Sequence, residues 1–282
     1  MDLRAELEAA ALEAVDIEPL GGGCVSAVYL LRLTDGERLV AKVDESDGHS
    51  LSIEADMLRY LAAHTALPVP EVRHVGEHLL VLEYLPGESR FSRGAERHAA
   101  ELLAALHGIS ADAYGFDFDT LIGGLHQPNP PSASWIEFFR QQRLLYMAAE
   151  ALRMGRLPAP IFERIESFSE HLGKWLFEPE RPSLIHGDMW TTNILARGSC
   201  ITGFLDPALY FAHDEIELAF TTLFHTFDRE FYDRYAEIRH IVPGFFEERR
   251  DIYNLYPLLV HVRLFGGAYV SSVTHTLEKY GY

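Results

Sequence analysis

One stretch near the middle of the chain constrains the fold more than any other. Residues 184–195 read Leu-Ile-His-Gly-Asp-Met-Trp-Thr-Thr-Asn-Ile-Leu, and Phe-Leu-Asp-Pro follows at residues 204–207. An apolar pair leads into a tight glycine turn, after which Asp188, Asn193 and Asp206 follow in order. Two acids and an amide in this order form the layout of a catalytic loop. The fold must therefore be one that can hold such a loop.

The spacing within this loop is the one that phosphoryl transfer uses. Protein kinases carry H-R-D-x-x-x-x-N and then D-F-G, in which the first Asp accepts the substrate hydroxyl proton while the Asn and second Asp hold magnesium. Asp188 and Asn193 have the same separation, although Gly187 replaces the Arg and Pro207 replaces the Phe. Because magnesium binds few protein oxygens beside those of phosphates, we expect Asn193 and Asp206 to be its ligands. Asp188 is the expected catalytic base. In the competing interpretation these residues only cap turns. That interpretation is the better one for any single residue, but not for the three residues together.

The composition is that of a globular protein with an acidic balance. With 282 residues, of which 48% are hydrophobic, the chain can bury a large core as one domain or two lobes. No apolar run approaches the roughly 20 residues of a membrane span, and the first residues lack the order of a signal peptide, so we expect a cytoplasmic protein without a membrane partner. A formal charge of −18 argues against a nucleic-acid partner. Cys24 and Cys200 are too few for a disulfide framework and fit a reducing compartment.

The N-terminal part is predicted to be a helix followed by β-structure. Apolar residues three and four apart indicate a helix over residues 3–15. Apolar runs beyond it predict strands, two of them joined by a hairpin turn at residues 34–37. Gly21, Gly22 and Gly23 precede this hairpin and leave backbone amides free to contact phosphate groups. A flexible surface turn is the alternative for these glycines.

A lysine and a glutamate extend the kinase-like pattern. Lys42 lies on the strand after the hairpin, within Val-Ala-Lys, where kinases place the lysine that contacts the α- and β-phosphates. A helix predicted over residues 51–61 makes Glu54 its natural partner. The alternative is a solvated surface position for both side chains. Together with the downstream loop, the pattern favours a pair that positions the nucleotide.

A second predicted hairpin ends near an expected adenine site. Apolar runs over residues 72–85 are followed by Pro-Gly-Glu at residues 86–88. The backbone of Glu83, Tyr84 and Leu85 is then placed to meet an adenine edge, by analogy with the kinase plan. By itself the run indicates only a strand.

The remainder of the chain has helical periodicity. Predicted helices cover residues 99–106, 135–144, 161–176, 214–227, 230–238 and 246–269. We therefore predict an α+β, bilobal, protein-kinase-like fold. Residues 1–86 form a small antiparallel β-rich lobe for nucleotide binding, and residues 87–282 form a larger, mainly helical lobe for catalysis and acceptor binding.

Five segments carry a further pattern. They are Gly-Gly-Gly-Cys-Val-Ser at residues 21–26, Trp-Ile-Glu-Phe-Phe-Arg-Gln-Gln-Arg-Leu at 135–144, His-Gly-Asp-Met-Trp-Thr-Thr-Asn at 186–193, Asp-Pro-Ala-Leu-Tyr-Phe-Ala-His-Asp-Glu-Ile-Glu-Leu-Ala at 206–219, and Leu-Phe-Gly-Gly-Ala-Tyr at 264–269. Across nearly the whole chain the sequence resembles the fructosamine kinase (ketosamine-3-kinase) family, whose fold is similar to that of aminoglycoside phosphotransferases and protein kinases. The resemblance implies ATP and Mg²⁺ as cofactors. It also implies transfer of the γ-phosphate to the 3-hydroxyl of a ketoamine, a fructosamine or ribulosamine that is free or protein-bound, in deglycation or metabolite repair.

The resemblance also implies roles for individual residues. Trp190, His213 and Glu217 match family positions on the acceptor side. Their alternatives are core packing for Trp190, a satisfied histidine for His213 and a helix-face charge for Glu217. Cys24 matches a cysteine of the glycine loop, where oxidation of an exposed thiol would impair nucleotide binding.

The sequence departs from the usual family residues near the expected acceptor pocket. Thr-Thr at residues 191–192 stands where Ser-Gly is usual, Ala212 where a Gly precedes the His, and His225 where Gly is frequent. Val260 and Arg263 occupy places that are often Asn. The phosphoryl-transfer residues are intact, but the acceptor stays open between a ketoamine and an amine of the aminoglycoside or choline type. The third possibility is a catalytically silent nucleotide-binding protein. Such a protein would have no chemical need to keep all four of Lys42, Asp188, Asn193 and Asp206.

Overall fold

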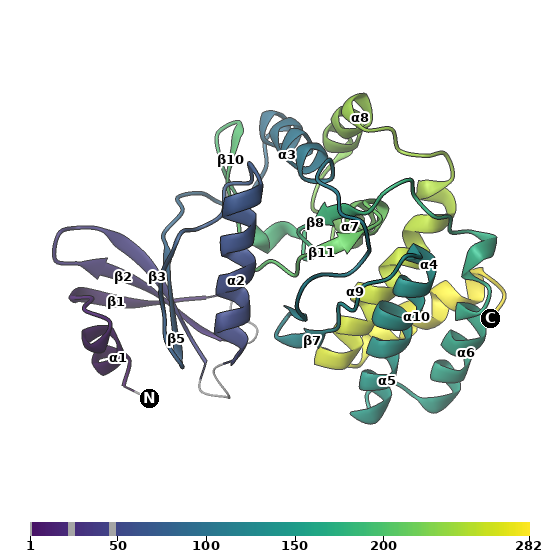
Figure 1. The fold of residues 1–282 in the computed structure, drawn as a ribbon, viewed down its shortest axis with the longest axis horizontal. Coiled ribbons are helices and arrows are strands. Elements are labelled where there is room, and N and C mark those ends of the chain that lie inside the picture. The colour runs from purple at the N-terminus through teal and green to yellow at the C-terminus, as the bar shows by residue number, and fades with distance from the viewer. Residues whose placement is uncertain (1, 22–25, 45–48) are drawn as a thin grey trace.

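The computed structural model describes residues 2–21, 26–44 and 49–282, which form a β-rich part and a larger helical part lying side by side (Figure 1). The β-rich part holds a five-stranded antiparallel sheet in the order β1-β2-β3-β5-β4. Its strands are β1 (Ala14–Leu20), β2 (Ala27–Leu33), β3 (Arg38–Val43), β4 (Val72–Val75) and β5 (Leu79–Glu83). The predicted α+β fold with two unequal lobes is confirmed. The division of the chain near residue 86 stays a prediction.

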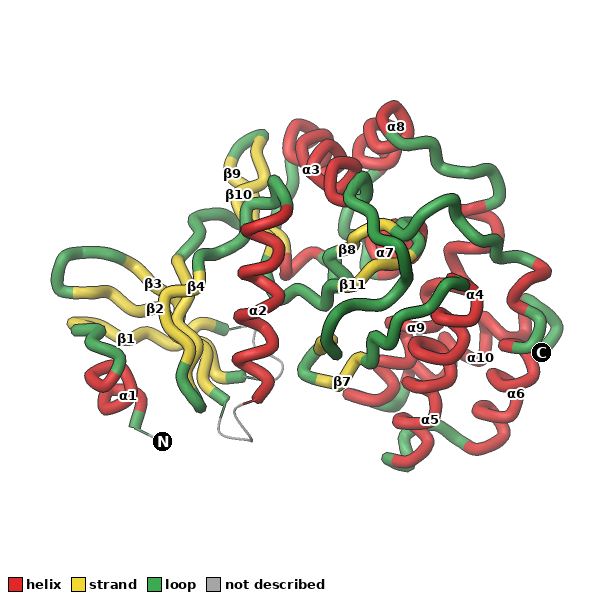
Figure 2. Tube along the Cα trace, in the orientation of Figure 1, coloured by secondary structure: helices red, strands yellow, loops and turns green. Residues whose placement is uncertain are grey.

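Helices dominate the second part, as the colouring by secondary structure shows (Figure 2). They are α3 (Arg93–Leu106), α4 (Trp135–Phe138), α5 (Tyr146–Arg153), α6 (Ala159–Ser169), α7 (Glu215–Leu223), α8 (Arg229–Ile238), α9 (Arg250–Phe265) and α10 (Ala268–Lys279), with the π-helical segments η1 (Phe139–Leu145) and η4 (Phe245–Arg249) and the 3₁₀ helices η2 (Leu172–Lys174) and η3 (Thr191–Asn193). Three strand pairs complete it: β6 (Thr120–Ile122) with β7 (Leu125–Gln127), β8 (Ser183–Ile185) with β11 (Tyr210–Ala212), and β9 (Ile194–Arg197) with β10 (Cys200–Phe204). Within the described ranges, no helix has the length and apolarity needed to cross a membrane.

The sheet buries two faces against two helices of the N-terminal part. Helix α2 (His49–His64) covers one face, where Leu51, Ala55 and Leu58 pack with Leu80 and Leu82 of β5. The alternate residues of β5 join a cluster on the other face with a side chain of helix α1 (Leu3–Ala9). This period of two is what a strand buried on both faces requires. It fixes α2 against the sheet and so positions Glu54.

The N-terminal helix is shorter than the apolar spacing predicts. The prediction of a helix over residues 3–15 is wrong beyond Ala9, because Ala11 has a φ of 57° and strand β1 begins at Ala14. A left-handed residue cannot continue a right-handed helix. β-Branched Val15 and Ile17 then favour the strand.

Several later helices also differ from their predicted limits. The helix predicted over residues 161–176 ends at Ser169, and the one predicted over residues 214–227 ends at Leu223. The helix that Ser134 caps runs through the π-helical η1 into α5 and ends at Arg153, well past residue 144. The predicted helix over residues 246–269 is broken, since Gly266 and Gly267 have φ values of 64° and 59° between α9 and α10. Glycine tolerates this backbone, and the chain turns there.

We predict that His225→Gly stabilises the protein. His225 is exposed just after α7 and has a φ of 53°, a conformation that costs a residue with a Cβ about 1 kcal/mol. This backbone gives a physical reason why glycine suits the position. Urea denaturation should therefore show a free energy of unfolding about 1 kcal/mol higher in the variant. His240→Gly, at an exposed position without positive φ, should show no gain; an equal or lower stability of His225→Gly would contradict the explanation.

Candidate active site

The loop that carries Asp188 is held by a backbone conformation that only glycine suits. Strand β8 pairs with β11 and leads into Gly187, whose φ is 88°. The backbone N–H of Ala208 donates to the carbonyl oxygen of His186 at 2.8 Å, so the two chain segments run in close contact. A Cβ on Gly187 would overlap the carbonyl oxygen of Ala208. An arginine at this position, as in the kinase pattern, does not fit the loop.

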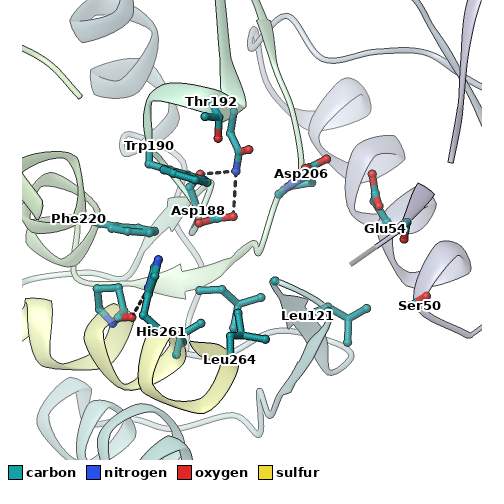
Figure 3. Close-up of a pocket in the computed structure, with 18 of the residues that line it drawn as sticks. Ser50, Glu54, Leu121, Asp188, Trp190, Thr192, Asp206, Phe220, His261 and Leu264 are labelled. Atoms are coloured by element: carbon teal, nitrogen blue, oxygen red, sulfur yellow. Dashed lines mark hydrogen bonds between the residues drawn. The ribbon is translucent and has the colours of Figure 1, made fainter. Parts of the chain in front are cut away.

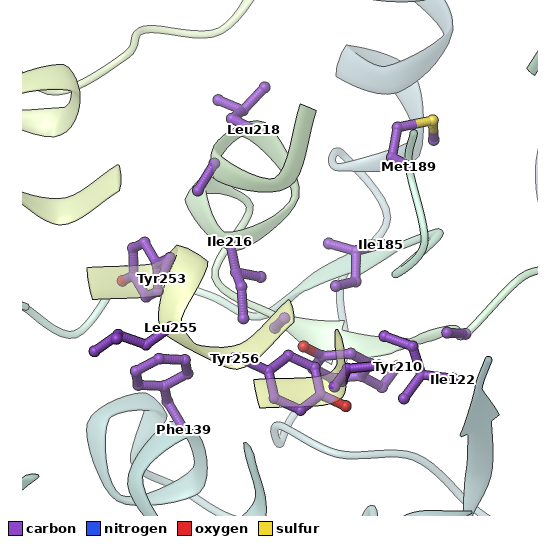
Figure 4. Close-up of a cluster of buried hydrophobic side chains, with 14 of the residues drawn as sticks. Ile122, Phe139, Ile185, Met189, Tyr210, Ile216, Leu218, Tyr253, Leu255 and Tyr256 are labelled. Carbon is purple, nitrogen blue, oxygen red and sulfur yellow. The ribbon is translucent and has the colours of Figure 1, made fainter. Parts of the chain in front are cut away.

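Buried apolar side chains fix both ends of the same loop. Ile185 and Met189 flank the turn and are almost completely buried. Figure 4 shows them in one cluster with Ile216 and Leu218 of α7 and with Tyr256 of α9. The packing of these buried side chains therefore fixes the position of the loop, as a site with a defined geometry requires.

The buried carboxylate of Glu217 binds the backbone of the loop through hydrogen bonds. Its Oε1 accepts the N–H of Gly187 at 2.6 Å, and its Oε2 accepts the N–H of His186 at 3.2 Å. The ring of His107 hydrogen-bonds the same Oε2 at 2.9 Å and contacts the hydroxyl of Tyr235 at 2.7 Å. Burial opposes ionisation, but these hydrogen bonds outweigh it and hold the pKa of Glu217 below its ordinary value.

The predicted acceptor contacts of His213 and Glu217 do not fit their positions. Glu217 is 2% exposed and occupied with the loop backbone. His213 is 4% exposed, hydrogen-bonds Asp214 at 2.9 Å and packs on Trp135 and Tyr253. Neither side chain lines the cavity described below. Both side chains point into the lobe, where Glu217 binds the loop backbone and Nδ1 of His213 bonds to Asp214, while Nε2 of His213 has no hydrogen-bond partner among the described residues.

Asp188 and Asn193 meet at the surface of the loop. The Nδ2 of Asn193 donates to Oδ2 of Asp188 at 2.9 Å and to its backbone oxygen at 3.0 Å. Burial raises the pKa of the Asp188 carboxyl to about 8, and the negative charge of Asp206 adds to the effect. The Oδ1 of Asn193 receives no hydrogen bond from the described residues and is available as a metal ligand.

The predicted pairing of Lys42 and Glu54 is present. The Nζ of Lys42 donates to Oε1 of Glu54 at 2.6 Å and also contacts Oδ1 of Asp206. Burial lowers the pKa of Lys42, but the two carboxylates outweigh it and raise the value above the ordinary one. Asp206 has a φ of 53° and a half-exposed side chain. A strained backbone of this kind clusters at functional sites.

The oxygen donors fit a magnesium ion. Among the described residues, no group of three or more His, Cys, Asp or Glu side chains could hold a metal by itself. Asn193 and Asp206 supply one amide oxygen and one carboxylate, which matches an ion that keeps waters and phosphate oxygens in its shell. These two side chains would hold it beside Lys42.

One cavity of about 470 Å³ joins these groups. It is lined by Lys42, Glu54, Asp188, Trp190, Asn193 and Asp206. Figure 3 shows Asp188 between Asp206 and a group of apolar and aromatic side chains from α7 and α9. The described glycine Gly21 is exposed directly after β1, while Gly22, Gly23 and Cys24 lie outside the described residues.

The end of β5 lies outside this cavity. The N–H of Glu83 donates to the carbonyl oxygen of Glu71 at 2.8 Å, so it is not free for a ligand. Tyr84 lies under the guanidinium of Arg38, at 4.1 Å from its ring centroid. The adenine contact of Glu83, Tyr84 and Leu85 stays a prediction. The backbone groups of Tyr84 and Leu85 are better candidates for this contact than the N–H of Glu83, which is already hydrogen-bonded.

Sequence reasoning missed the aromatic side of the cavity. Phe220 lies on α7 and Phe224 directly follows it, while His261, Leu264 and Phe265 lie on α9. Their helical spacing is equally typical of core packing, so no local pattern singled them out. The Leu-Phe at residues 264–265 belonged to a matched segment but carried no assigned role.

Comparisons with known proteins show which proteins this chain is similar to. The family model for Fructosamine kinase matches residues 2–281. A probable ketoamine kinase of Vibrio parahaemolyticus is 34% identical over 271 residues, covering 92% of this chain and 90% of that protein. A crystal structure from Thermobifida fusca, assigned provisionally as a fructosamine-3-kinase, has a TM-score of 0.87 at 28% identity and covers 98% of this chain and 97% of its own.

A more distant structure shows how widely the fold is shared. An ADP-bound aminoglycoside phosphotransferase has a TM-score of 0.69 at 18% identity, covering 99% of this chain and 97% of its own. That likeness concerns the fold, which is of the protein-kinase-like type. The family match over almost the whole chain decides the assignment: this protein is a phosphotransferase that belongs to the fructosamine kinase family.

Proposed function

We propose that the protein transfers the γ-phosphate of ATP to a sugar hydroxyl of a ketoamine, in deglycation or metabolite repair. The observation that carries this proposal is the convergence of Lys42, Asn193 and Asp206 on Asp188 within one cavity. Residues 1–86 would then form the nucleotide-binding lobe and residues 87–282 the catalytic lobe. The family match supports this proposal, and so does the similarity to a relative named as a probable ketoamine kinase.

Each residue has a role that its contacts support. Asp188 accepts the proton of the attacking hydroxyl, and Asn193 orients its carboxylate through the 2.9 Å hydrogen bond. Lys42, held by Glu54, positions the phosphates, with backbone amides of Gly21, Gly22 and Gly23 beside them. Magnesium, when bound, neutralises charge on the phosphates and on Asp206.

An acceptor panel tests this function. Purified protein with Mg²⁺ and ATP is given fructosamines, ribulosamines, a glycated protein, aminoglycosides and choline, and ADP release is followed. We expect acceptor-dependent turnover with ketoamines. Turnover with an aminoglycoside or choline alone would contradict the proposed acceptor, and the lack of any ATP binding would contradict the kinase assignment of the site.

Lys42→Ala should weaken productive ATP binding. This variant removes the ammonium group that contacts Glu54 and Asp206. A charge-assisted hydrogen bond to phosphate contributes about 10- to 100-fold to binding. We therefore expect kcat/KM for ATP to fall by at least about tenfold. The exposed Lys174→Ala serves as the control and should leave ATP dependence unchanged. An unaltered ATP dependence of Lys42→Ala, in a folded variant, would remove Lys42 from the site.

A further inference from the structure

A row of aromatic rings forms the wall of the cavity away from the lysine. The ring centroids of Phe224 and His261 are 4.9 Å apart, and those of His261 and Tyr269 are 4.8 Å apart. Phe224 also contacts Trp190 at 5.6 Å, and His261 contacts Phe265 at 5.8 Å. All five side chains line the cavity. His261 is therefore the centre of an aromatic subsite made of Trp190, Phe224, His261, Phe265 and Tyr269.

His261 presents one ring nitrogen to the cavity. Its Nδ1 lies 2.7 Å from the carbonyl oxygen of Pro257. A carbonyl oxygen only accepts, so Nδ1 must carry the proton and donate. Burial lowers the pKa of His261, which keeps the ring neutral. Nε2 is then a hydrogen-bond acceptor, and no residue in the described part of the chain donates to it.

The charge around the cavity is uneven. Among the described residues that line it, the only carboxylates are Glu54, Asp188 and Asp206. Glu54 and Asp206 both contact Lys42, and Asp188 is the proposed base. The aromatic subsite itself holds no acid. A polycation such as an aminoglycoside would leave several charges without partners there, which is costly in a partly buried site.

A single ammonium group suits this subsite. Aromatic ring faces attract one cation within about 6 Å of their centroids. A neutral imidazole nitrogen accepts a hydrogen bond from an N–H of that cation. The nitrogen of a ketoamine is a secondary amine, which is protonated near neutral pH and carries two N–H donors.

We propose that the aromatic subsite binds the protonated amine of the acceptor, with Nε2 of His261 accepting a hydrogen bond from the ammonium N–H and the neighbouring rings facing its charge. This inference rests on the proposed function and names the group by which the same site selects its substrate. The subsite selects a monocation with an N–H donor and an apolar nitrogen substituent. It discriminates against polycations by lacking acids and against quaternary amines by needing the donor.

Three ligands separate charge from hydrogen bonding. They are 1-benzylamino-1-deoxyfructose, its N,N-dimethyl quaternary form, which keeps the charge but has no N–H, and 1-benzamido-1-deoxyfructose, in which a benzoyl group replaces the benzyl group, so that the nitrogen keeps its N–H but has no charge. Their affinities are measured by calorimetry on the full chain with Mg²⁺ and a non-hydrolysable ATP analogue. We expect the amine to bind about 10- to 100-fold more tightly than the quaternary form, the range of a hydrogen bond to a charged donor. The amide should also bind at least about tenfold more weakly than the amine.

Variants assign the hydrogen bond to His261. In His261→Phe the ring remains but Nε2 is lost, so the preference for the amine over the quaternary form should fall to about one. His261→Gln keeps an acceptor and should retain part of the preference. The control His240→Phe, at an exposed position outside the cavity, should keep all of it. Unchanged affinity for the ATP analogue shows that each variant is folded.

The outcomes separate this inference from the function on which it rests. An equal affinity of the wild type for the amine and the quaternary form would overturn the inference. A preference that survives in a folded His261→Phe would overturn it as well. Ketoamine turnover together with either result leaves the proposed function standing and only the inference fails. Selective binding of the amine without any turnover supports the subsite and contradicts the function, and the absence of both binding and turnover contradicts the two together.

Discussion

Asp188→Asn should reduce turnover by about 10²- to 10⁴-fold, the usual contribution of a general base. The substitution keeps the size of the side chain and a hydrogen-bonding partner for Asn193, so the loop should stay in place. What it removes is the carboxylate that accepts the hydroxyl proton. Steady-state kinetics with a ketoamine and saturating ATP measure the loss, which should fall on kcat with little change in ATP affinity.

A matched substitution controls for the loss of an acid. Asp56 lies on α2 with a side chain that is 59% exposed, and Asp56→Asn should leave turnover unchanged. Nearly normal turnover of Asp188→Asn would refute the assignment of Asp188 as the base. Loss of ATP-analogue binding in that variant would instead indicate that the substitution disturbs the nucleotide site.

Gly187→Ala should destabilise the protein by about 3 kcal/mol or more, since it combines backbone strain with an overlap between Cβ and a backbone oxygen. The φ of 88° disfavours alanine, and the carbonyl oxygen of Ala208 occupies the space that a Cβ needs. The hydrogen bonds of the loop to Glu217 should weaken as the backbone moves. Urea denaturation measures the loss, and turnover should fall with it.

Gly198→Ala isolates the overlap from the strain. Gly198 has a φ of 65° in a turn with no atom within 4 Å of an added Cβ. Its substitution should therefore cost only the backbone strain, about 1 kcal/mol. Equal losses in the two variants would show that the contact with Ala208 relaxes and that glycine is not required in the loop.

Patterns along the sequence were sufficient for most of the fold. The apolar runs of the first lobe predicted the strands of the sheet, because each strand is buried against a neighbour and shows it locally. The spacing of Asp188 and Asn193 predicted two side chains that do meet, since both lie on one short loop. The pairing of Lys42 with Glu54 was predicted from the kinase pattern, in which a strand lysine pairs with a helix glutamate, and the two side chains are in contact.

Features set by tertiary packing were not predictable in this way. The family resemblance implied that His213 and Glu217 lie on the acceptor side, but the direction of their side chains depends on how α7 packs against the catalytic loop. The aromatic subsite brings Trp190 of the loop and Phe224 at the end of α7 together with residues of α9 and α10, and the helical residues have the spacing of core residues. The early end of the first helix depended on the single left-handed residue Ala11.

The most direct test of the account follows the phosphate itself. Purified protein is incubated with Mg²⁺, ATP labelled in the γ-phosphate and one fructosamine, and the label is located by chromatography and phosphorus NMR. We expect label on the sugar 3-hydroxyl, in an amount equal to the ADP formed, and at most about one hundredth of that amount with Asp188→Asn at the same time point. Release of the label only as inorganic phosphate, or no use of ATP with any ketoamine, would contradict the central claim.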